Sequence, residues 1–284
     1  MKKLLFAAAA FAAGVSMADI TSANVVGYTT HKLWGNNYIT WSMATVQDMA
    51  NTLEEQTIGS FKIPTDQAFG SGASIVLEIW GNNGKLVGSY SFCDVENCGN
   101  YGLTNPGWYP LAKMEGWEAT DEDLSNNVQL PFGYVAVITS AEADSTLTFA
   151  GQVLGEKTYK IWGNNYVSWV GNATPVQLWL KDFAIPTDQA FGSGASIVLE
   201  IWGNNGKLVG SYSFCDVENC GNYGLTNPGW YPLAKMEGWE ATDEDLMNNK
   251  VSIAPGQMVV ITSAEADTTL TIPDPMKVTP PAAA

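Results

Sequence analysis

Arginine is absent from this chain of 284 residues, and histidine occurs once, as His31. The 13 cationic side chains are therefore all lysines, against 29 carboxylates, and the formal net charge is −16 at pH 7. Nucleic acid is excluded as an expected partner, because phosphate binding needs clustered cations. A histidine metal cluster is excluded by count, and a Ser-His-Asp or Cys-His arrangement would depend on His31 alone. We expect His31 to be an outward-facing strand residue.

Long apolar runs are also scarce. The one clear case, Leu4 to Val15, follows Lys2 and Lys3 and precedes Ser16-Met17-Ala18. This order of basic, apolar and small residues predicts a cleaved signal peptide over residues 1–18, and the run is too short to span a bilayer. No later segment approaches membrane-spanning length. We therefore expect no transmembrane segment and a secreted protein, whether extracellular, on the cell surface or periplasmic.

Most of the remaining chain is a tandem duplication. The segment from Phe61 to Leu124 recurs as Phe183 to Leu246 with a single difference, Lys62 against Ala184. The flanks of the two copies are similar but have diverged. We expect two domains, repeat 1 over residues 19–149 and repeat 2 over residues 150–275. The proline- and alanine-rich tail, residues 276–284, is predicted to be disordered.

The 4 cysteines fall in a Cys-Asp-Val-Glu-Asn-Cys loop that each repeat carries. Export permits disulfides, and four cysteines allow three pairings. Pairing within each loop is the simplest, so we predict the disulfides Cys93–Cys98 and Cys215–Cys220. A thiolate metal site is the alternative, but it needs four ligands and would have to join the two repeats.

Short β-prone segments separated by turns dominate both repeats. Gly-Asn-Asn at 35–37 and 163–165 lies between such segments and predicts tight turns. Ser74 to Trp80 and Lys85 to Phe92 predict a hairpin in which Asn82-Asn83 is the loop, Ile79 faces Leu86, Leu77 faces Gly88 and Ile75 faces Tyr90. One short helix is expected, within Thr45 to Ile58. The fold class is all-β, and we expect two tandem, jelly-roll-like β-sandwich repeats.

Several short motifs together carry a resemblance. They are the opening Val25-Val26-Gly27-Tyr28, Gly107-Trp108-Tyr109, Gly171 to Val176, and Pro255 to Val260 with the Thr-Leu-Thr strand after it. The chain resembles secreted, internally duplicated β-proteins of bacteria in the Verrucomicrobia and Lentisphaerae group, over nearly the whole mature chain. Those proteins look like uncharacterised exported β-proteins, so the resemblance implies export and duplication and brings no activity or catalytic residues.

Aromatic residues are the most suggestive candidates for a binding site, since the chain has 11 tryptophans. Several lie in a glycine-rich passage that reads as loop. Exposed indoles there could stack on sugar rings, and two copies would add avidity. The alternative is that these rings fill the ends of the two cores. The candidate glycan-binding residues are Trp108, Tyr109, Trp117, Trp230, Tyr231 and Trp239.

Acidic loops supply the other candidates. Asp121, Asp123, Asp243 and Asp245 could gather around calcium, although their spacing does not match an EF-hand loop. Carboxylate pairs such as Asp94 with Glu96 could serve a hydrolase, but a glycosidase needs two carboxyls about 5 to 9 Å apart and nothing in the sequence shows such pairing.

These observations predict a non-enzymatic exported protein with a structural or adhesive role at the cell surface or in the extracellular matrix. The alternative is a bivalent carbohydrate-binding module that uses its loop tryptophans. No cofactor is expected apart from calcium, and the candidate partners are a polysaccharide or a second copy of the protein.

Overall fold

The computed structural model describes residues 26–43, 56–61, 75–95, 97–131, 133–141, 144–185, 197–217 and 219–281. The expected signal peptide, residues 1–18, lies outside the described residues. So does most of the expected helix between Thr45 and Ile58. Its last residues are described, and they form a short strand and the start of a 3-10 helix instead.

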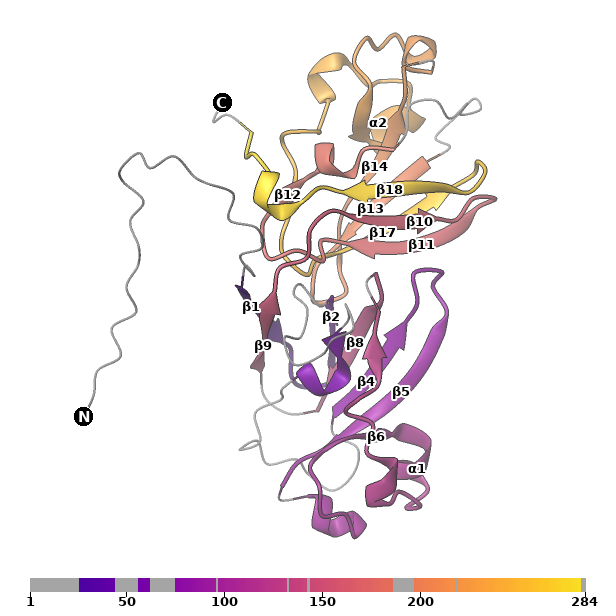
Figure 1. The fold of residues 1–284 in the computed structure, drawn as a ribbon. Helices are drawn as coiled ribbons and strands as arrows, with labels where there is room; N and C mark the ends of the chain where they lie inside the picture. Colours follow the sequence, from indigo (N-terminus) through magenta and orange to yellow (C-terminus); the bar gives the residue numbers. More distant parts are fainter. Residues whose placement is uncertain are drawn as a thin grey trace, which may run out of the picture.

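Strands are the main regular elements of repeat 1, with a few short helical turns between them (Figure 1). Its strands are β1 (Val26–Leu33), β2 (Tyr38–Ser42), β3 (Gln56–Thr57), β4 (Ile75–Trp80), β5 (Leu86–Cys93), β6 (Gly107–Pro110), β7 (Gln129–Leu130), β8 (Val135–Ser140) and β9 (Ser145–Gln152). Its helical turns are η1 (Ile58–Ser60), η2 (Cys98–Tyr101), α1 (Leu111–Glu115) and η3 (Asp121–Asp123).

Repeat 2 has the same elements in the same order. Its strands are β10 (Lys157–Ile161), β11 (Tyr166–Gly171), β12 (Leu178–Trp179), β13 (Ile197–Trp202), β14 (Leu208–Cys215), β15 (Gly229–Pro232), β16 (Ser252–Ile253), β17 (Met258–Ser263) and β18 (Thr268–Ile272). Its helical turns are η4 (Leu180–Phe183), η5 (Cys220–Tyr223), α2 (Leu233–Glu237), η6 (Asp243–Asp245) and, after the last strand, η7 (Pro275–Lys277).

Each repeat contains one five-stranded antiparallel sheet, in the order β2-β8-β4-β5-β6 in repeat 1 and β11-β17-β13-β14-β15 in repeat 2. Two-stranded pairs, β1-β9 and β3-β7 in repeat 1, accompany it. Alternation along the strands gives each sheet one apolar face. In repeat 1 that face packs against side chains of the two-stranded pairs. The core that results contains Leu33, Ile58, Phe61, Ile75, Leu77, Ile79, Trp108, Leu130, Ala136, Ile138, Leu147 and Phe149.

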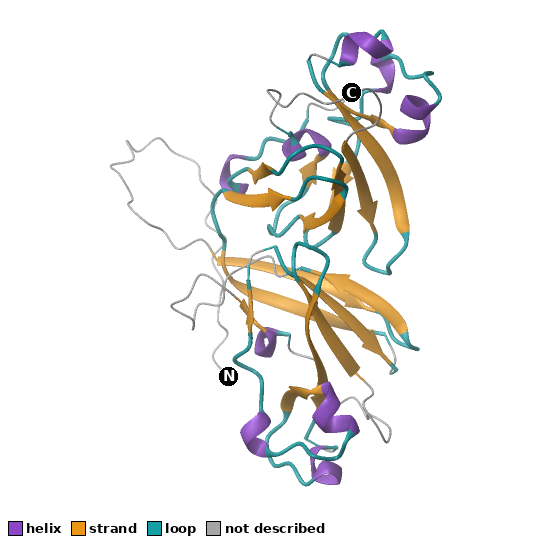
Figure 2. Ribbon diagram, turned by 90° about the vertical axis from the view of Figure 1, so that its right-hand side faces the viewer, coloured by secondary structure: helices purple, strands orange, loops and turns teal. Residues whose placement is uncertain are grey.

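The all-β prediction is confirmed (Figure 2). The division of strands differs from that of a jelly roll, which has two sheets of similar size. Here a five-stranded sheet is combined with two strand pairs, β1–β9 with eight residues in each strand and β3–β7 with two.

The predicted β4–β5 hairpin forms, but its register was wrong. Leu77 pairs with Tyr90 and Ile79 with Gly88, a shift of two residues from the prediction. Because side chains alternate with a period of two, this shift leaves the same residues on the core face. The predicted apolar face is therefore correct even though the pairs are not.

The shift originates at the hairpin tip. The amide of Gly81 donates to the carbonyl of Lys85, and Gly84 adopts a left-handed conformation with φ of +67°. The loop thus has three residues, with a glycine where a positive φ is required. A bulge follows, so that Leu86 lies opposite Trp80 and is half exposed, not opposite Ile79 in the core.

The outer faces of the two large sheets meet at a junction between the repeats (Figures 1 and 2). Four indoles form a continuous row there. Trp80 stacks on Trp169 with 5.3 Å between ring centroids, Trp169 stacks on Trp41 at 5.6 Å, and Trp41 lies against Trp202 at 5.2 Å. From the alternation of side chains, we expected Trp80 on the polar face of its hairpin, pointing to solvent. That face is covered by the other repeat.

The described residues of the C-terminal tail, 276–281, begin within η7, and two of them contact repeat 2. Pro275 is buried, and Asp274 caps η7 by accepting a hydrogen bond from the amide of Met276 at 3.0 Å. Val278 packs against the core of repeat 2, and Lys181 donates to the carbonyl of Thr279 at 3.2 Å. Its prolines fix the backbone of a segment that the body of repeat 2 holds in place.

Both predicted disulfides are present, Cys93–Cys98 and Cys215–Cys220. Replacing Cys93 and Cys98 by serine is expected to lower the free energy of unfolding by about 2 kcal/mol, because the short loop becomes freer in the unfolded chain. Urea unfolding measures this loss. The matched change at Cys215 and Cys220 should give a similar value, and an unchanged midpoint in both variants would contradict the expectation.

Candidate functional site

Each repeat has a helical lobe, which is the part that contains α1 in repeat 1 and α2 in repeat 2. Trp117 and Trp239 are the exposed large aromatic side chains of these two lobes. Their exposed fractions are 68% and 66%. Each follows a short helix, and the amide of Trp117 closes the turn by donating to the carbonyl of Met114 at 3.2 Å. Both take a left-handed backbone conformation, with φ of +58° and +56°. This position at a helix end usually carries glycine, so a bulky residue there is strained by about 1 kcal/mol.

A tyrosine supports each exposed indole from one side. Tyr101 stacks on Trp117 with 4.8 Å between centroids and 26° between planes. Tyr223 stacks on Trp239 at 4.7 Å and 24°. The ring of Trp117 is thereby held in a fixed orientation, while its exposure shows that much of its surface remains open to solvent. We call each pair an aromatic platform.

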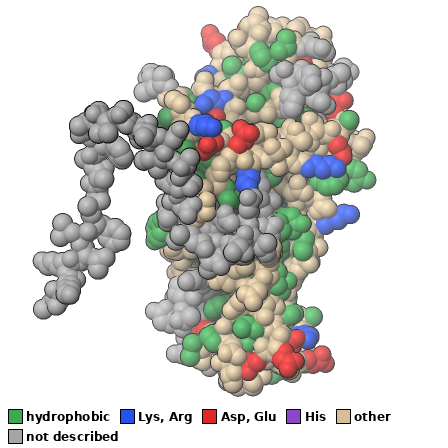
Figure 3. All heavy atoms as spheres, in the orientation of Figure 1, with side chains coloured by type: hydrophobic (Ala, Val, Ile, Leu, Met, Phe, Trp, Pro, Cys, Tyr) green, Lys and Arg blue, Asp and Glu red, His purple; other side chains and the backbone are tan. Residues whose placement is uncertain are grey.

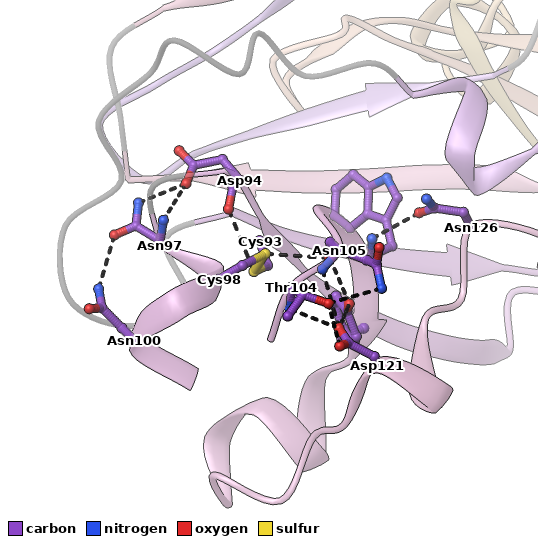
Figure 4. Close-up of a disulfide and its surroundings, with 11 residues drawn as sticks. Cys93, Asp94, Asn97, Cys98, Asn100, Thr104, Asn105, Asp121 and Asn126 are labelled. Atoms are coloured by element: carbon purple, nitrogen blue, oxygen red, sulfur yellow. Dashed lines mark hydrogen bonds between the residues drawn. A yellow bond between two sulfur atoms is a disulfide. The ribbon is translucent and has the colours of Figure 1, made fainter. Parts of the chain in front are cut away.

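The disulfide loop positions the tyrosine of each platform. Tyr101 ends η2, which begins at Cys98 of the disulfide. Within the loop, Asp94 is fully buried and its Oδ1 accepts from the amide and the side chain of Asn97, at 2.7 and 3.1 Å (Figure 4). The amide of Cys98 donates to the carbonyl of Asp94 at 3.0 Å. The loop is therefore fixed by a disulfide and a carboxylate together.

Asp121, a predicted calcium ligand, ties two loops of the lobe together (Figure 4). Its carboxylate accepts from the amide and hydroxyl of Thr104, at 2.9 and 2.6 Å, and from the amide of Asn105 at 3.2 Å. The Tyr109 hydroxyl also lies 3.4 Å from it. The hydrogen bonds from Thr104 lower the pKa of Asp121. Asp243 has the same partners in repeat 2.

Asp123, the second predicted ligand, serves as a cap. Its carboxylate accepts from the amide and hydroxyl of Thr120 and pairs with Lys113. The hydrogen bond from Lys113 is the main reason that its pKa is lowered. Asp245 repeats this arrangement, and there the pKa falls to about 2. Protein donors thus bind all four predicted ligands. Within the described residues there is no group of three or more His, Cys, Asp or Glu side chains placed to hold a metal ion. The calcium site stays a prediction.

The remaining predicted glycan contacts lie inside the protein. Trp108 and Trp230 are each 1% exposed, and Tyr109 and Tyr231 are fully buried. Their rings have no face open to a ligand, so the alternative of core packing applies to these four. Burial raises the pKa of Tyr109 to about 12, with the charge of Asp121 contributing. Only Trp117 and Trp239 of the six remain as surface candidates.

His31 was predicted to face outward, and this was wrong. It is 8% exposed, its Nδ1 lies 2.6 Å from Ser42 Oγ, and its ring contacts Phe149 edge-on. Its Nε2 has no hydrogen-bond partner among the described residues. Beside it is a cavity of about 330 Å³ at the junction, between β1 and residues 254–257 of repeat 2. Burial lowers the pKa of His31 to about 4, so it is neutral at pH 7.

Sequence reasoning missed Tyr101 and Tyr223, the supporting rings of the platforms. The available signal was their position, because each lies three residues after the second cysteine of a loop and directly before a glycine. It also missed the junction indoles, whose signal was a tryptophan on the polar face of a strand. Glu96 of the predicted carboxylate pair lies outside the described residues, so that pair stays a prediction.

Comparison with protein-family models, with curated proteins and with solved structures finds no match to this chain. No helix in the described part of the chain is long and apolar enough to cross a membrane. The function is therefore argued from the platforms and their surroundings.

Proposed function

We propose that the protein is a non-catalytic, exported protein of the cell surface or extracellular matrix that adheres to saccharide through Trp117 and Trp239. The observation that supports this most directly is that a bulky indole occupies a strained, glycine-type backbone position and is exposed in both repeats. Folding alone favours glycine there. Strained residues of this kind concentrate at ligand-binding sites.

The shape of the platform favours a sugar ring as ligand. A flat indole held by a stacked tyrosine offers an apolar surface that does not need to be ordered on binding. The C–H groups on one face of a pyranose ring are apolar and match such a surface, while the hydroxyls at the ring edge stay solvated or bond to nearby polar groups. The two disulfides fit a protein of an oxidising compartment.

The negative charge near the platform favours neutral or cationic ligands over anionic ones. Glu115, Glu118 and Glu122 lie within five residues of Trp117 in the chain and are exposed, and Lys113 is paired with Asp123. Figure 3 shows acidic side chains gathered at the end of the molecule that carries α1. Like charges repel, so polymers rich in sulfate or uronic acid are disfavoured. We propose a neutral or amino-sugar polysaccharide.

The two platforms belong to lobes at opposite ends of the molecule, as the positions of α1 and α2 show (Figures 1 and 2). One molecule can therefore bridge two polymer strands or two surfaces. Avidity arises only when both ends are engaged on a ligand long enough to reach both, or on a dense array.

Replacing both Trp117 and Trp239 by glycine is the test. Glycine suits the left-handed backbone, so the variant should fold with unchanged or slightly raised stability. Binding to neutral or amino-sugar polysaccharide is expected to fall at least tenfold, since loss of about 1.4 kcal/mol of stacking at one site suffices. A glycan array with the mature chain, in calcium and in chelator, identifies the class, and titration calorimetry measures the loss.

The matched control is Tyr38→Ala with Tyr166→Ala, which removes two aromatic rings of similar exposure, 63% and 67%, from elsewhere on the two repeats. Binding should be unchanged in this control. Equal binding by the glycine variant and the unaltered protein would overturn the platform assignment. The absence of binding to any saccharide class would leave a structural role through self-association.

A further inference from the structure

The contacts between the repeats occur in pairs with the two repeats exchanged. The amide of Trp41 in repeat 1 donates to the carbonyl of Asn204 in repeat 2 at 2.9 Å. The amide of Trp169 in repeat 2 donates to the carbonyl of Asn82 in repeat 1 at 2.7 Å. Each hairpin tip thus binds the edge strand of the other repeat.

The side chains of the two hairpin-tip asparagines also make paired contacts in which the two repeats are exchanged. Asn204 Oδ1 accepts from the Trp34 indole at 3.1 Å and its Nδ2 donates to the Lys32 carbonyl at 3.3 Å. The equivalent contacts in the other direction join Asn82 to the Trp162 indole at 3.3 Å and to the Lys160 carbonyl at 3.2 Å. The row of four indoles is likewise symmetric about the Trp41–Trp169 pair.

An interface in which one patch meets an equivalent patch is the kind that holds two-fold dimers together. Here both halves belong to one chain. The connection between them is the segment 153–156, from the end of β9 to the start of β10. Within the described residues no sheet contains strands of both repeats. A repeat can therefore leave its neighbour without any strand having to change its pairing.

The two halves are nevertheless not interchangeable at the centre. Met43 corresponds to Gly171 in the other repeat, and the two lie in contact: a Cβ on Gly171 would be 2.4 Å from Met43 Sδ. A second pair of contacts does keep the symmetry, because the ring of His31 covers Gly256 of repeat 2 and the ring of Tyr159 covers the equivalent Gly133 of repeat 1. If repeat 1 met another repeat 1, Met43 would face Met43. Repeat 1 is therefore shaped to pair with repeat 2.

We propose that the junction is a self-recognition surface through which two copies of this chain exchange repeats, repeat 1 of one molecule pairing with repeat 2 of the other. All junction contacts are then reformed between molecules, which is the condition for domain swapping at low free-energy cost. The inference goes beyond the proposed saccharide binding and uses none of its residues. An exchanged dimer presents twice as many aromatic platforms as a single molecule.

Complementation between two full-length variants tests the exchange. One chain carries Trp41→Ala and Asn82→Ala, which remove junction side chains from repeat 1. The other carries Trp169→Ala and Asn204→Ala in repeat 2. Within either chain the junction always includes an altered repeat. In a mixed pair, the unaltered repeat 2 of the first chain meets the unaltered repeat 1 of the second, and an intact junction forms between molecules.

The two chains carry different affinity tags and are unfolded and refolded together. Sequential purification on both tags, followed by light scattering, is expected to yield a 1:1 heterodimer in at least tenfold excess over the same-variant pair. The matched control refolds two differently tagged samples of one variant, where no intact junction can form. Equal yields in mixture and control, with circular dichroism showing both variants folded, would overturn the proposal.

The unaltered chain provides a second arm should either variant fail to fold. Refolded at rising concentration, it is expected to give a dimer fraction that increases with concentration, and co-refolded tagged copies should purify together. A monomer at every concentration would overturn the proposal. Molecular mass is the readout, so a failure of saccharide binding leaves the result unaffected.

Discussion

Trp108→Ala is expected to lower the free energy of unfolding by about 4 kcal/mol, the usual loss when a buried tryptophan is removed from a core. The ring is 1% exposed and packs edge-on against Phe92, with 5.1 Å between centroids. Its amide is also fixed by Asn126 Oδ1 at 3.0 Å. Denaturant unfolding followed by circular dichroism measures the loss, and saccharide binding by the folded fraction should be unchanged.

Two comparisons make this prediction specific. Trp230→Ala should destabilise at least as much, because the Trp230 indole donates to the Phe183 carbonyl at 3.1 Å, whereas Trp108 Nε1 has no partner among the described residues. Trp117→Gly should leave stability unchanged or slightly higher. If Trp108→Ala reduced binding and left stability intact, its ring would have to be at the surface, and the packing described for β6 would be wrong.

Acidification from pH 6.5 to pH 4 is expected to lower the free energy of unfolding by about 3 kcal/mol, because His31 is buried in its neutral form. Its pKa is about 4 in the folded protein against 6.5 when exposed, so the unfolded chain binds the proton first as the pH falls. Above pH 6.5 His31 is neutral in both the folded and the unfolded chain, so the free energy of unfolding has its full value. That free energy falls as the pH drops from 6.5 to 4, and His31 causes no further change below pH 4. Urea midpoints at half-unit pH steps measure the slope.

The control is His31→Tyr, which places at this position the residue found at Tyr159 in repeat 2. The decrease between pH 6.5 and 4 should disappear, whatever the absolute stability of the variant. Carboxylates act in a separate window. The pKa values of Asp121, Asp123 and Asp144 are lowered by hydrogen bonds, so their contribution is present above about pH 4 and lost below it. A slope that persisted in His31→Tyr would contradict the assignment to His31.

Local pattern determined much of the fold in advance. The apolar alternation in Ile75, Leu77 and Ile79 defined the core face of β4, and the spacing of Cys93 and Cys98 defined the disulfide. Both depend on residues near each other in the chain. The exact pairing of β4 with β5 failed because the sequence does not distinguish a two-residue from a three-residue loop at Asn82, where asparagine and glycine suit either.

The candidate site was predicted only in part, for a related reason. Trp108 and Trp117 both stand beside glycine in the same passage, yet one fills the core and the other is exposed. Trp108 belongs to a core cluster that also contains Leu130 and Phe149, which come from distant strands. The sequence likewise showed Asp121 only as a possible metal ligand, and not the hydrogen bond that the amide of Thr104 donates to its carboxylate. Trp80 looked solvent-facing because the surface that covers it belongs to the other repeat.

The pairing of Asn82 with repeat 2 and Asn204 with repeat 1 has a consequence for the history of the gene. Both asparagines lie in the near-identical block, so recombination that copies this block from one repeat into the other leaves every hairpin-tip contact unchanged. Copying the flank would place methionine at position 171 against Met43. The geometry of the junction thus allows recombination to make the centres of the repeats identical, and it disfavours copying the flank that contains Met43 into repeat 2.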